Sequence, residues 1–301
     1  MDFSDIIARV AEMLGLPDND SNFSTKIKAW INESYKSISS MDLWPWLVKN
    51  DVVQTSVEIV AGTVDVTNAS TAITFSSGPA VSVATDWRIQ FSGDDNWYDI
   101  TSHTAGATAA VLADNFLGTT DTVATYTLRK VYYSLPSDVD HIMSVRQSVN
   151  NIKLKAIDTR FFDMHFPDPT SVAGPKAYLI IGQDSSQNYR MVLHPTPSDE
   201  INVDIRYYQK VSDLSADADE PLIPSQFRPV LIFDVLSKYG YMFLDDTRIN
   251  QAAGIRNSFL RDMKAAANPS PDNVTKKLPW DKAQLFTPRT NRLPFNFPIE
   301  E

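Results

Sequence analysis

Cysteine, long apolar runs and an excess of basic residues are all missing from this chain of 301 residues. Without cysteine, disulfides, thiolate nucleophiles and cysteine metal sites are excluded. No stretch approaches the roughly 18 consecutive apolar residues of a transmembrane helix, so we expect no membrane partner. The amino terminus, Met1 to Asp5, lacks the basic and then apolar layout of a signal peptide.

The charge balance is acidic, with 27 Lys and Arg against 37 Asp and Glu and a formal net charge of −10. A protein that reads a nucleic-acid sequence needs a basic face that neutralises phosphates. The balance therefore argues against that class. It leaves open a protein that DNA passes without binding tightly.

Signatures of catalysis are also missing from the sequence. There is no Gly-x-Ser-x-Gly elbow, no phosphate loop and no Gly-x-Gly-x-x-Gly fingerprint. His165 stands near Asp163 and Asp168, but a turn whose carboxylates cap backbone amides explains this pattern better than a metal site. We expect no enzyme activity, no cofactor and no metal.

Hydrophobic periodicity and breakers predict an α+β chain, in which a discontinuous helical bundle carries an inserted all-β sandwich or barrel. A second strand-rich region and an extended arm complete it. The predicted stretches are an N-terminal helix pair (1–50), the inserted all-β domain (51–131), the strand-rich region (132–221), a C-terminal helix pair (222–266) and an extended proline-rich C-terminal arm (267–301).

The two helix pairs show apolar residues at spacings of three and four, which place those residues on one face of each helix. Neither pair can bury its apolar face alone, so we expect them to pack together from opposite ends of the chain. Pro224 is expected near the start of the third helix, and Asp245-Asp246 near the start of the fourth. The predicted helical core comprises Trp30, Tyr35, Trp44, Trp46, Phe227, Leu231 and Phe259.

Two of the three tryptophans of that core, Trp44 and Trp46, flank Pro45, which ends the second helix. A buried corner of the helical core is the favoured interpretation of this pair. A platform on which a ligand stacks is the alternative, because paired aromatic rings also stack on bases or sugars.

In the predicted all-β domain, apolar residues alternate with Thr, Ser and Asp, as half-buried strands require. The expected strands include Val57 with Ile59, Val64 with Val66, and Val81 with Val83. The stretch 51–131 holds nine acidic residues against Arg88, Arg129 and Lys130, which predicts a negative surface. Farther along, residues 177–182 and 189–193 are predicted to form a hairpin, and residues 142–145 a short helical or extended link.

The C-terminal arm holds six of the eighteen prolines, which disfavours regular helix and central strands. Yet apolar and aromatic residues are spaced through it, and a solvated linker has few of these. We expect the arm to lie on its own body or on a partner subunit. Its predicted anchors and polar clamps are Trp280, Phe286, Arg289, Arg292, Phe295 and Phe297.

Four ordered segments together resemble the tailed-phage head-to-tail adaptor (head completion, connector) family. They are the helix pair with Ala29 to Lys36 and Leu43 to Leu47, the stretch Tyr133 to Arg146, the run Tyr207 to Phe227 with its acidic loop, and the final helix pair ending Phe259 to Met263. The inserted all-β domain, around Trp97 to Ile100, looks like a module common in tailed-phage structural proteins.

The resemblance implies a homo-oligomeric ring, a dodecamer, beneath the portal protein in the virion, at the capsid–tail junction. Such a ring continues the channel for double-stranded DNA and receives the tail or the next connector protein. The chain would be made in the host cytoplasm. An acidic wall fits this role because it repels phosphates.

Two alternatives come from other classes of protein. A glycan-binding virion or surface protein would use the all-β domain as a lectin-like module, with Trp87, Trp97 and Tyr98 stacking on sugars. A glycosidase would need two carboxylates facing one cleft, and the candidates are Asp94 with Asp95, or Asp217 with Asp219 and Glu220. Both acidic groups lie in turn contexts, where solvated loop charge is the simpler interpretation.

Overall fold

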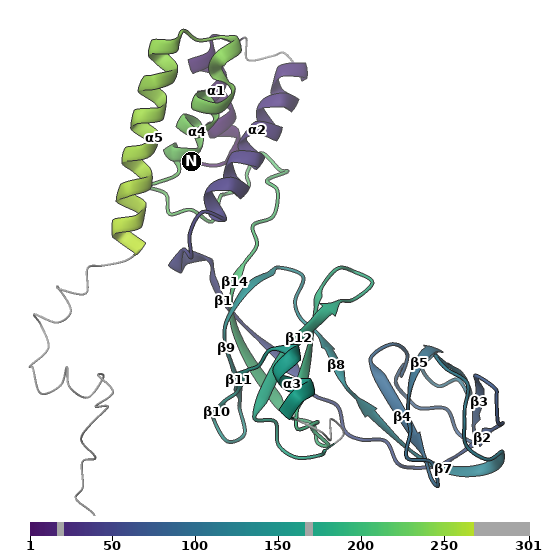
Figure 1. Cartoon of the computed structure of the whole chain (residues 1–301). Helices are drawn as coiled ribbons and strands as arrows, with labels where there is room; N and C mark the ends of the chain where they lie inside the picture. The colour runs from purple at the N-terminus through teal and green to yellow at the C-terminus, as the bar shows by residue number, and fades with distance from the viewer. Residues whose placement is uncertain (17–20, 166–170, 268–301) are drawn as a thin grey trace, which may run out of the picture. The chain divides into compact units, whose positions relative to one another are not determined.

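The computed structural model describes residues 1–16, 21–165 and 171–267 (Figure 1). These residues form five α-helices and fourteen strands, so the expected α+β class is confirmed. The chain divides into two compact units. The first, Met1–Trp46 with Val211–Glu301, is called the helical unit; the second, Leu47–Lys210, is called the β unit.

The helical unit combines helices from both ends of the chain (Figure 1). Among them, α4 contacts each of the other three helices, and α1 also contacts α2. The apolar faces of the early and late helices are thus buried within one unit. The helices are α1 (Phe3–Leu14), α2 (Ser21–Ser39), α4 (Pro229–Tyr239) and α5 (Asp246–Ala267).

Local sequence signals explain both ends of α1. The Asp2 carboxylate accepts a hydrogen bond from the Asp5 backbone N–H, and the Asp5 carboxylate accepts one from the Asp2 backbone N–H, which makes a capping box. Gly15 ends the helix in the left-handed conformation, with φ of 69°. Between them α1 buries Phe3, Ile6, Val10, Ala11 and Leu14, which follow the helical period.

The third helix begins later than the sequence predicts. Pro224 accepts a backbone hydrogen bond from Phe227 across a turn (2.8 Å), and α4 starts only at Pro229. Proline suits the first helical position because the first N–H groups of a helix have no intrahelical acceptor. Phe227 is buried, but it lies just before the helix. The fourth helix does begin at the predicted pair, at Asp246.

The all-β module is a closed six-stranded barrel with strand order β2-β3-β6-β5-β4-β7. This resolves the sandwich-or-barrel alternative in favour of the barrel. Every strand buries alternate side chains, and these form one hydrophobic core. The strands are β2 (Thr63–Val66), β3 (Ala72–Phe75), β4 (Trp87–Phe91), β5 (Trp97–His103), β6 (Ala109–Leu112) and β7 (Asp121–Lys130).

Two strands predicted for this module are not regular strands. Ile59 forms only an isolated bridge with Leu128. Val83 is fully buried, but its backbone N–H donates to the side-chain ring of His103 (3.2 Å) rather than to a backbone carbonyl of a strand. A side-chain acceptor can replace a sheet partner in this way, and the alternation of apolar residues does not reveal it.

The remaining strands of the β unit form two four-stranded sheets, ordered β1-β14-β9-β10 and β11-β12-β13-β8. The predicted hairpin is confirmed, because β12 pairs antiparallel with β13. The predicted link at 142–145 lies within strand β9. The bounds are β1 (Val48–Gln54), β8 (Tyr132–Ser134), β9 (Val139–Gln147), β10 (Ile152–Lys153), β11 (Lys155–Ala156), β12 (Ala177–Gln183), β13 (Tyr189–His194) and β14 (Asn202–Gln209), with helix α3 (Thr159–His165) before β12.

Strand β1 begins before the predicted boundary at residue 51 and does not join the barrel. It pairs with β14, and Val53 lies opposite Val203 in that ladder. The pairing is long-range, between strands about 150 residues apart in the sequence. A strand's partner is set by three-dimensional packing, so the residue pattern of β1 alone could not identify it.

Candidate functional site

The candidate site lies in the helical unit, where an acidic loop (residues 211–220) crosses the start of α1. The backbone N–H of Phe3 donates to the Asp219 carbonyl (2.8 Å), and that of Ser4 donates to the Asp217 carbonyl (3.0 Å). These N–H groups have no acceptor within the helix. The loop therefore supplies the acceptors that the first turn of α1 needs and is fixed to it.

Helix α2 holds the other side of this chain segment. The Asn32 amide exchanges two hydrogen bonds with the backbone of Leu214. The Tyr35 hydroxyl accepts one from the Leu222 backbone N–H (2.8 Å). Burial raises the pKa of Tyr35, so its hydroxyl stays protonated at neutral pH. The acidic loop is thus tied to both N-terminal helices.

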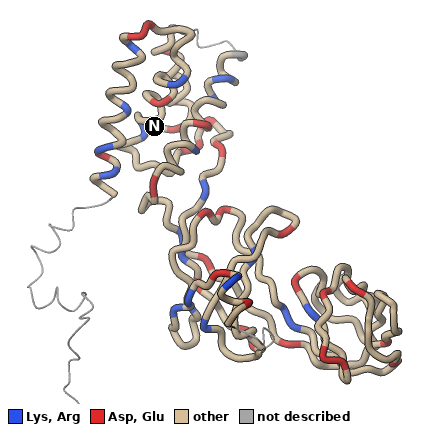
Figure 2. Tube along the Cα trace, viewed as in Figure 1, with Lys and Arg blue, Asp and Glu red and all other residues tan. Residues whose placement is uncertain are grey.

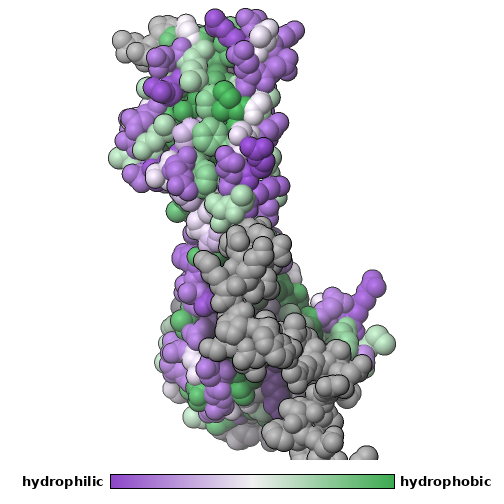
Figure 3. All heavy atoms as spheres, turned by 90° about the vertical axis from the view of Figure 1, so that its left-hand side faces the viewer, coloured by the Kyte–Doolittle hydropathy of each residue, from purple (hydrophilic) through white to green (hydrophobic). Residues whose placement is uncertain are grey.

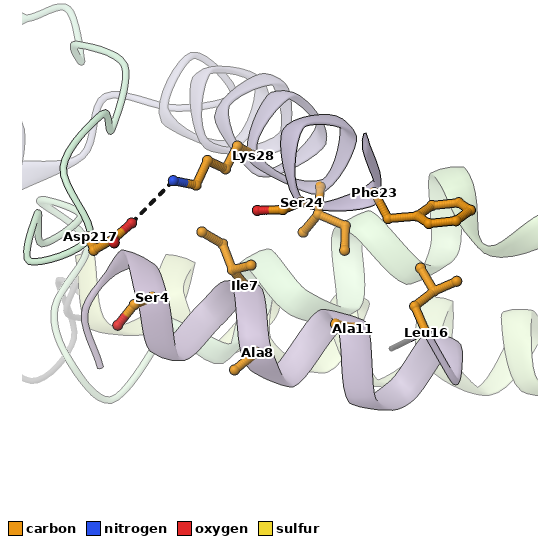
Figure 4. A pocket seen from close by; sticks show the side chains of 10 residues that line it. Ser4, Ile7, Ala8, Ala11, Leu16, Phe23, Ser24, Lys28 and Asp217 are labelled. Atoms are coloured by element: carbon orange, nitrogen blue, oxygen red, sulfur yellow. Dashed lines mark hydrogen bonds and ion pairs between the residues drawn. The ribbon is translucent and has the colours of Figure 1, made fainter. Parts of the chain in front are cut away.

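A groove of about 260 Å³ lies between α1 and α2 beside this loop (Figure 4). Ala8 and Ala11 of α1 line this groove, and their small side chains leave room between the two helices. We call it the α1–α2 groove. It is lined by Ser4, Ile7, Ala8, Ala11, Leu16, Phe23, Ser24, Ile27, Lys28 and Asp217.

The two ends of the groove differ in chemistry, as Figure 4 shows. Leu16 and Phe23 make one end apolar. At the other end, Lys28 Nζ lies 3.1 Å from an Asp217 carboxylate oxygen, and the Asp217 side chain is 74% exposed. An exposed pair of this kind contributes little to stability. Both charged groups are therefore accessible to charged groups of a binding partner.

A buried ion cluster joins α4 and α5. Asp234 is fully buried, with Lys238 Nζ at 2.8 Å and Arg256 Nε at 2.5 Å from its carboxylate oxygens. Lys238 also donates to the hydroxyl of Ser37 in α2 (3.2 Å). A buried carboxylate needs such partners, because an unpaired buried charge is strongly destabilising. The cluster therefore links three helices through one anion.

The seven predicted core residues all lie in the helical unit. Trp44 is 1% exposed, and its indole N–H donates to the Ile38 carbonyl (2.8 Å). It stacks on Trp46 at 4.9 Å between ring centroids, and Trp46 is half-buried. Tyr35, Phe227 and Leu231 are also buried, whereas Trp30 and Phe259 are half-buried.

The half-buried Trp30 stacks on Tyr239 of α4, with ring centroids 5.1 Å apart and nearly parallel planes. Burial, followed by a hydrogen bond to Glu33, raises the pKa of the Tyr239 hydroxyl above its usual value. The stack therefore packs α2 on α4 with a neutral phenol. These contacts place the aromatic residues within the packing of the helical unit. Because Trp44 is buried, its ring has no open face on which a ligand can stack.

The predicted anchors and clamps of the C-terminal arm are outside the described residues. The six residues concerned are Trp280, Phe286, Arg289, Arg292, Phe295 and Phe297.

The lectin-like alternative loses two of its three stacking residues. Trp87 and Tyr98 belong to the barrel core, with 4% and 5% of their surface exposed. Trp97 is half-buried and lies under the Arg129 guanidinium, 4.8 Å from the ring centroid. A sugar that stacks needs an open aromatic face, so the barrel offers no ready platform of these three rings.

Four of the five carboxylates considered for a glycosidase are used by the fold. Asp94 accepts hydrogen bonds from the Tyr98 hydroxyl and from Asn96. Asp219 accepts backbone hydrogen bonds from Ser215 and Ala216, which lower the pKa of its carboxyl.

The neighbours of Asp219 in the acidic loop are paired as well. Asp217 contacts Lys28, and Glu220 pairs with Arg228 at 2.8 Å. The loop charges therefore cap turns and form ion pairs. They have structural partners of the kind expected for solvated loop charge.

The histidine pattern near His165 forms no metal site that the structure displays. His165 contacts the Phe161 carbonyl through its Nδ1 (3.1 Å), and Asp168 is outside the described residues. Across residues 1–16, 21–165 and 171–267, no group of three or more His, Asp or Glu side chains is placed to hold a metal ion.

Charge is unevenly distributed over the described chain (Figure 2). The barrel, residues 63–130, carries seven acidic and three basic residues, and all three basic residues lie on β4 and β7. Figure 3 shows the hydropathy of the helical unit. A hydrophobic band runs along the face that carries α5, with hydrophilic residues on both sides. Ile255 of α5, 42% exposed, is an apolar residue outside the core.

Sequence reasoning missed the α1–α2 groove and the buried ion cluster. Asp234 gave one signal, since a carboxylate stands inside the apolar run Val230 to Leu236. Ala8 and Ala11 gave a weaker one, as small residues beside an apolar stripe. The pairing of Lys28 with Asp217 had no sequence signal, because 189 positions separate the two residues.

Comparison with known families gives a match over much of the chain. The family model described as SU10 adaptor protein matches residues 88–276, which is more than half of the chain and spans parts of both units. No curated protein sequence matches the chain. Separately, none of the described helices has both the length and the apolar content needed to cross a membrane.

Proposed function

Because the chain belongs to the SU10 adaptor protein family, we propose that it forms a ring under the phage portal and joins the capsid to the tail. Family membership makes it a phage adaptor, a structural protein of the virion that contacts other head or tail proteins. The match over 88–276 carries the proposal, since it covers the barrel from β4 onward, both sheets apart from strand β1, α4 and α5.

Ring formation needs a heterologous interface, in which two different patches meet head to tail until the ring closes. The discontinuous helical bundle supplies two such patches in our proposal. One is the α1–α2 groove, and the other is the side of the unit that carries α5 and leads into the C-terminal arm. A ring of twelve copies is our working subunit number.

The C-terminal arm supplies contacts beyond its own body in this proposal, on the portal protein or on a neighbouring subunit. Trp280, Phe286, Phe295 and Phe297 are the apolar anchors, and Arg289 and Arg292 the polar clamps. Burying one such aromatic side chain contributes roughly 1.5–3 kcal/mol. The four anchors together contribute roughly 6–12 kcal/mol toward the free energy of association.

Passage of double-stranded DNA is the second part of the role. A net charge of −10 gives the ring no general attraction for phosphates. A bore lined by acidic side chains lets the duplex slide, because tight binding requires clustered Lys and Arg. The proposal requires binding and shape only, with no catalytic group, cofactor or metal.

Electron microscopy of the full chain, alone and mixed with the portal protein encoded by the same phage, tests the proposal. We expect rings or portal-capped particles. A chain ending at Ala267 keeps every described element and should keep its circular dichroism spectrum, but it should not assemble. Lone monomers of the full chain in both samples would contradict the proposed function.

A further inference from the structure

The α1–α2 groove is apolar surface that the helical unit leaves uncovered. Ile7, Leu16 and Phe23 stay partly exposed there although the opposite side of α1 is buried. Its volume of about 260 Å³ is below the roughly 300–1,000 Å³ of small-molecule sites. The groove therefore suits one or two apolar side chains of a polypeptide better than a cofactor.

We infer that this groove receives an aromatic anchor from the C-terminal arm of a second copy of the chain. The inference rests on the proposed ring and names the contact that joins its neighbours. The arm brings eight apolar residues of suitable size, which are Leu278, Trp280, Leu285, Phe286, Leu293, Phe295, Phe297 and Ile299.

Length and charge both favour the arm as the occupant. Thirty-four residues follow Ala267, and a fully extended chain of that length reaches roughly 110–120 Å. Residues 276–292 carry five basic side chains and one acidic one, whereas 1–46 with 211–267 carry fifteen acidic and ten basic. A positive segment is thus attracted to a negative unit, and Asp217 offers it a carboxylate at the groove's polar end.

The position of α5 favours a second copy over the same copy. In the helical unit α4 lies between α5, which leads into the arm, and α2, which forms one wall of the groove (Figure 1). Helix α5, which precedes the arm, therefore lies on one side of α4, while the groove between α1 and α2 lies on another. Two different patches on different sides make the head-to-tail contact from which rings are built.

Photocrosslinking of the full chain tests the inference directly. A photoreactive p-benzoylphenylalanine replaces Trp280 or Phe286, and mass spectrometry locates the adducts. We expect a dimer-sized product in which the label joins α1 or the Phe23–Lys28 stretch of another copy. Products confined to single chains, adducts on other elements, or no crosslinked product at any protein concentration would each overturn the inference.

Two exposed alanines provide a matched pair of variants. Ala8 lines the groove and Ala29 of α2 does not, and each has a glutamate four residues later. Ala8→Arg should reduce the dimer-sized product at least about tenfold, because a charge in an apolar contact is costly. Ala29→Arg should leave it unchanged. Equal yields from the two variants would count against the groove.

The same samples separate this inference from the proposed function. If the unlabelled full chain caps portal particles but the crosslinks lie elsewhere, the groove assignment is wrong and the adaptor role stands. If crosslinks join the arm to the groove but no particle includes portal, the adaptor role is wrong and the groove assignment stands.

Discussion

Asn32 and Leu214, 182 positions apart, are joined by two hydrogen bonds. The Asn32 side-chain amide donates to the Leu214 carbonyl (3.0 Å), and the Leu214 backbone N–H donates to the Asn32 amide oxygen (2.8 Å). One side chain thus completes the backbone hydrogen bonding of the acidic loop, as a paired strand would. This pair fixes the loop on α2 beside the α1–α2 groove.

Replacing this amide should weaken the helical unit. Asn32→Ala leaves the Leu214 N–H and carbonyl unpaired in a nearly buried setting, so the free energy of unfolding should fall by about 1–3 kcal/mol. Urea unfolding, with hydrogen exchange of α2 to report on this unit, measures the change. Asn250→Ala, at an exposed position of α5, should change it by less than about 0.5 kcal/mol. Equal effects of both variants would contradict the role of the pair.

The buried carboxylate of Asp234 should be more sensitive still. Asp234→Ala leaves Lys238 and Arg256 without their buried anion, and breaking a buried ion pair costs about 3–5 kcal/mol. Thermal unfolding of the full chain should show an earlier transition for the helical unit. The control is Asp262→Ala, which removes an exposed carboxylate 3.8 Å from Arg261 and should have almost no effect.

Stability at high pH should depend on Tyr207 in the β unit. Its hydroxyl is buried and donates to Asp138 (2.8 Å), and burial followed by this hydrogen bond raises the pKa of Tyr207 to about 12. The unfolded chain loses this proton near the ordinary value of about 10. The stabilisation is therefore complete below about pH 10 and is lost as the pH rises through about 12.

Tyr207→Phe tests this directly. Between about pH 10 and 12 the variant should lose less stability than the original chain, since it has no hydroxyl to ionise. Urea unfolding across this range measures the slope. Tyr241→Phe, at a residue 64% exposed, is the control and should keep the original slope. A parallel slope for Tyr207→Phe would contradict the assignment.

Asp138 should shape the acid side of the same profile. Partial burial raises its pKa, but hydrogen bonds from Lys49 and Tyr207 outweigh this and lower the pKa of the carboxyl below its usual value. Its contribution is therefore present above about pH 3.9 and is lost as the pH falls through the lower folded value. Asp138→Asn should reduce the loss of stability at acid pH, as measured by urea unfolding. An unchanged dependence of stability on acid pH would contradict this role of Asp138.

The fold class, helices α1, α2 and α5 and the barrel strand at Val64–Val66 followed from hydrophobic period and breakers. Local signals were sufficient there: the Asp2 capping box and Gly15 delimit α1, and apolar alternation marks the strand at Val64–Val66. The start of α4 was displaced because Pro224 favoured a turn while Pro229 opened the helix. A proline suits either position, so its presence alone does not choose between them.

The candidate site was largely hidden from the sequence because its contacts are long-range. Asn32 with Leu214 and Lys28 with Asp217 join residues far apart in the chain, and neither pair has a spacing rule. Val83 is a further case that the sequence pattern could not predict. Its backbone N–H donates to the His103 ring instead of to a backbone carbonyl of a strand. Patterns along a chain report faces and ends of elements, and packing decides which faces meet.

Two glycines should respond to alanine in opposite directions. Gly254 lies in the exposed part of α5, and a Cβ added there meets no atom within 4 Å. Gly254→Ala should raise the free energy of unfolding of the helical unit by about 0.5–1 kcal/mol, because glycine loses more backbone entropy in a helix.

Gly78 of the barrel is packed against the backbone of Gly106 and Ala107, where a Cβ would collide with the Ala107 carbonyl. Gly78→Ala should lower the stability of the β unit by about 1–3 kcal/mol. Thermal unfolding of both variants checks the signs, and two shifts in the same direction would show that space at the Cβ does not decide the outcome.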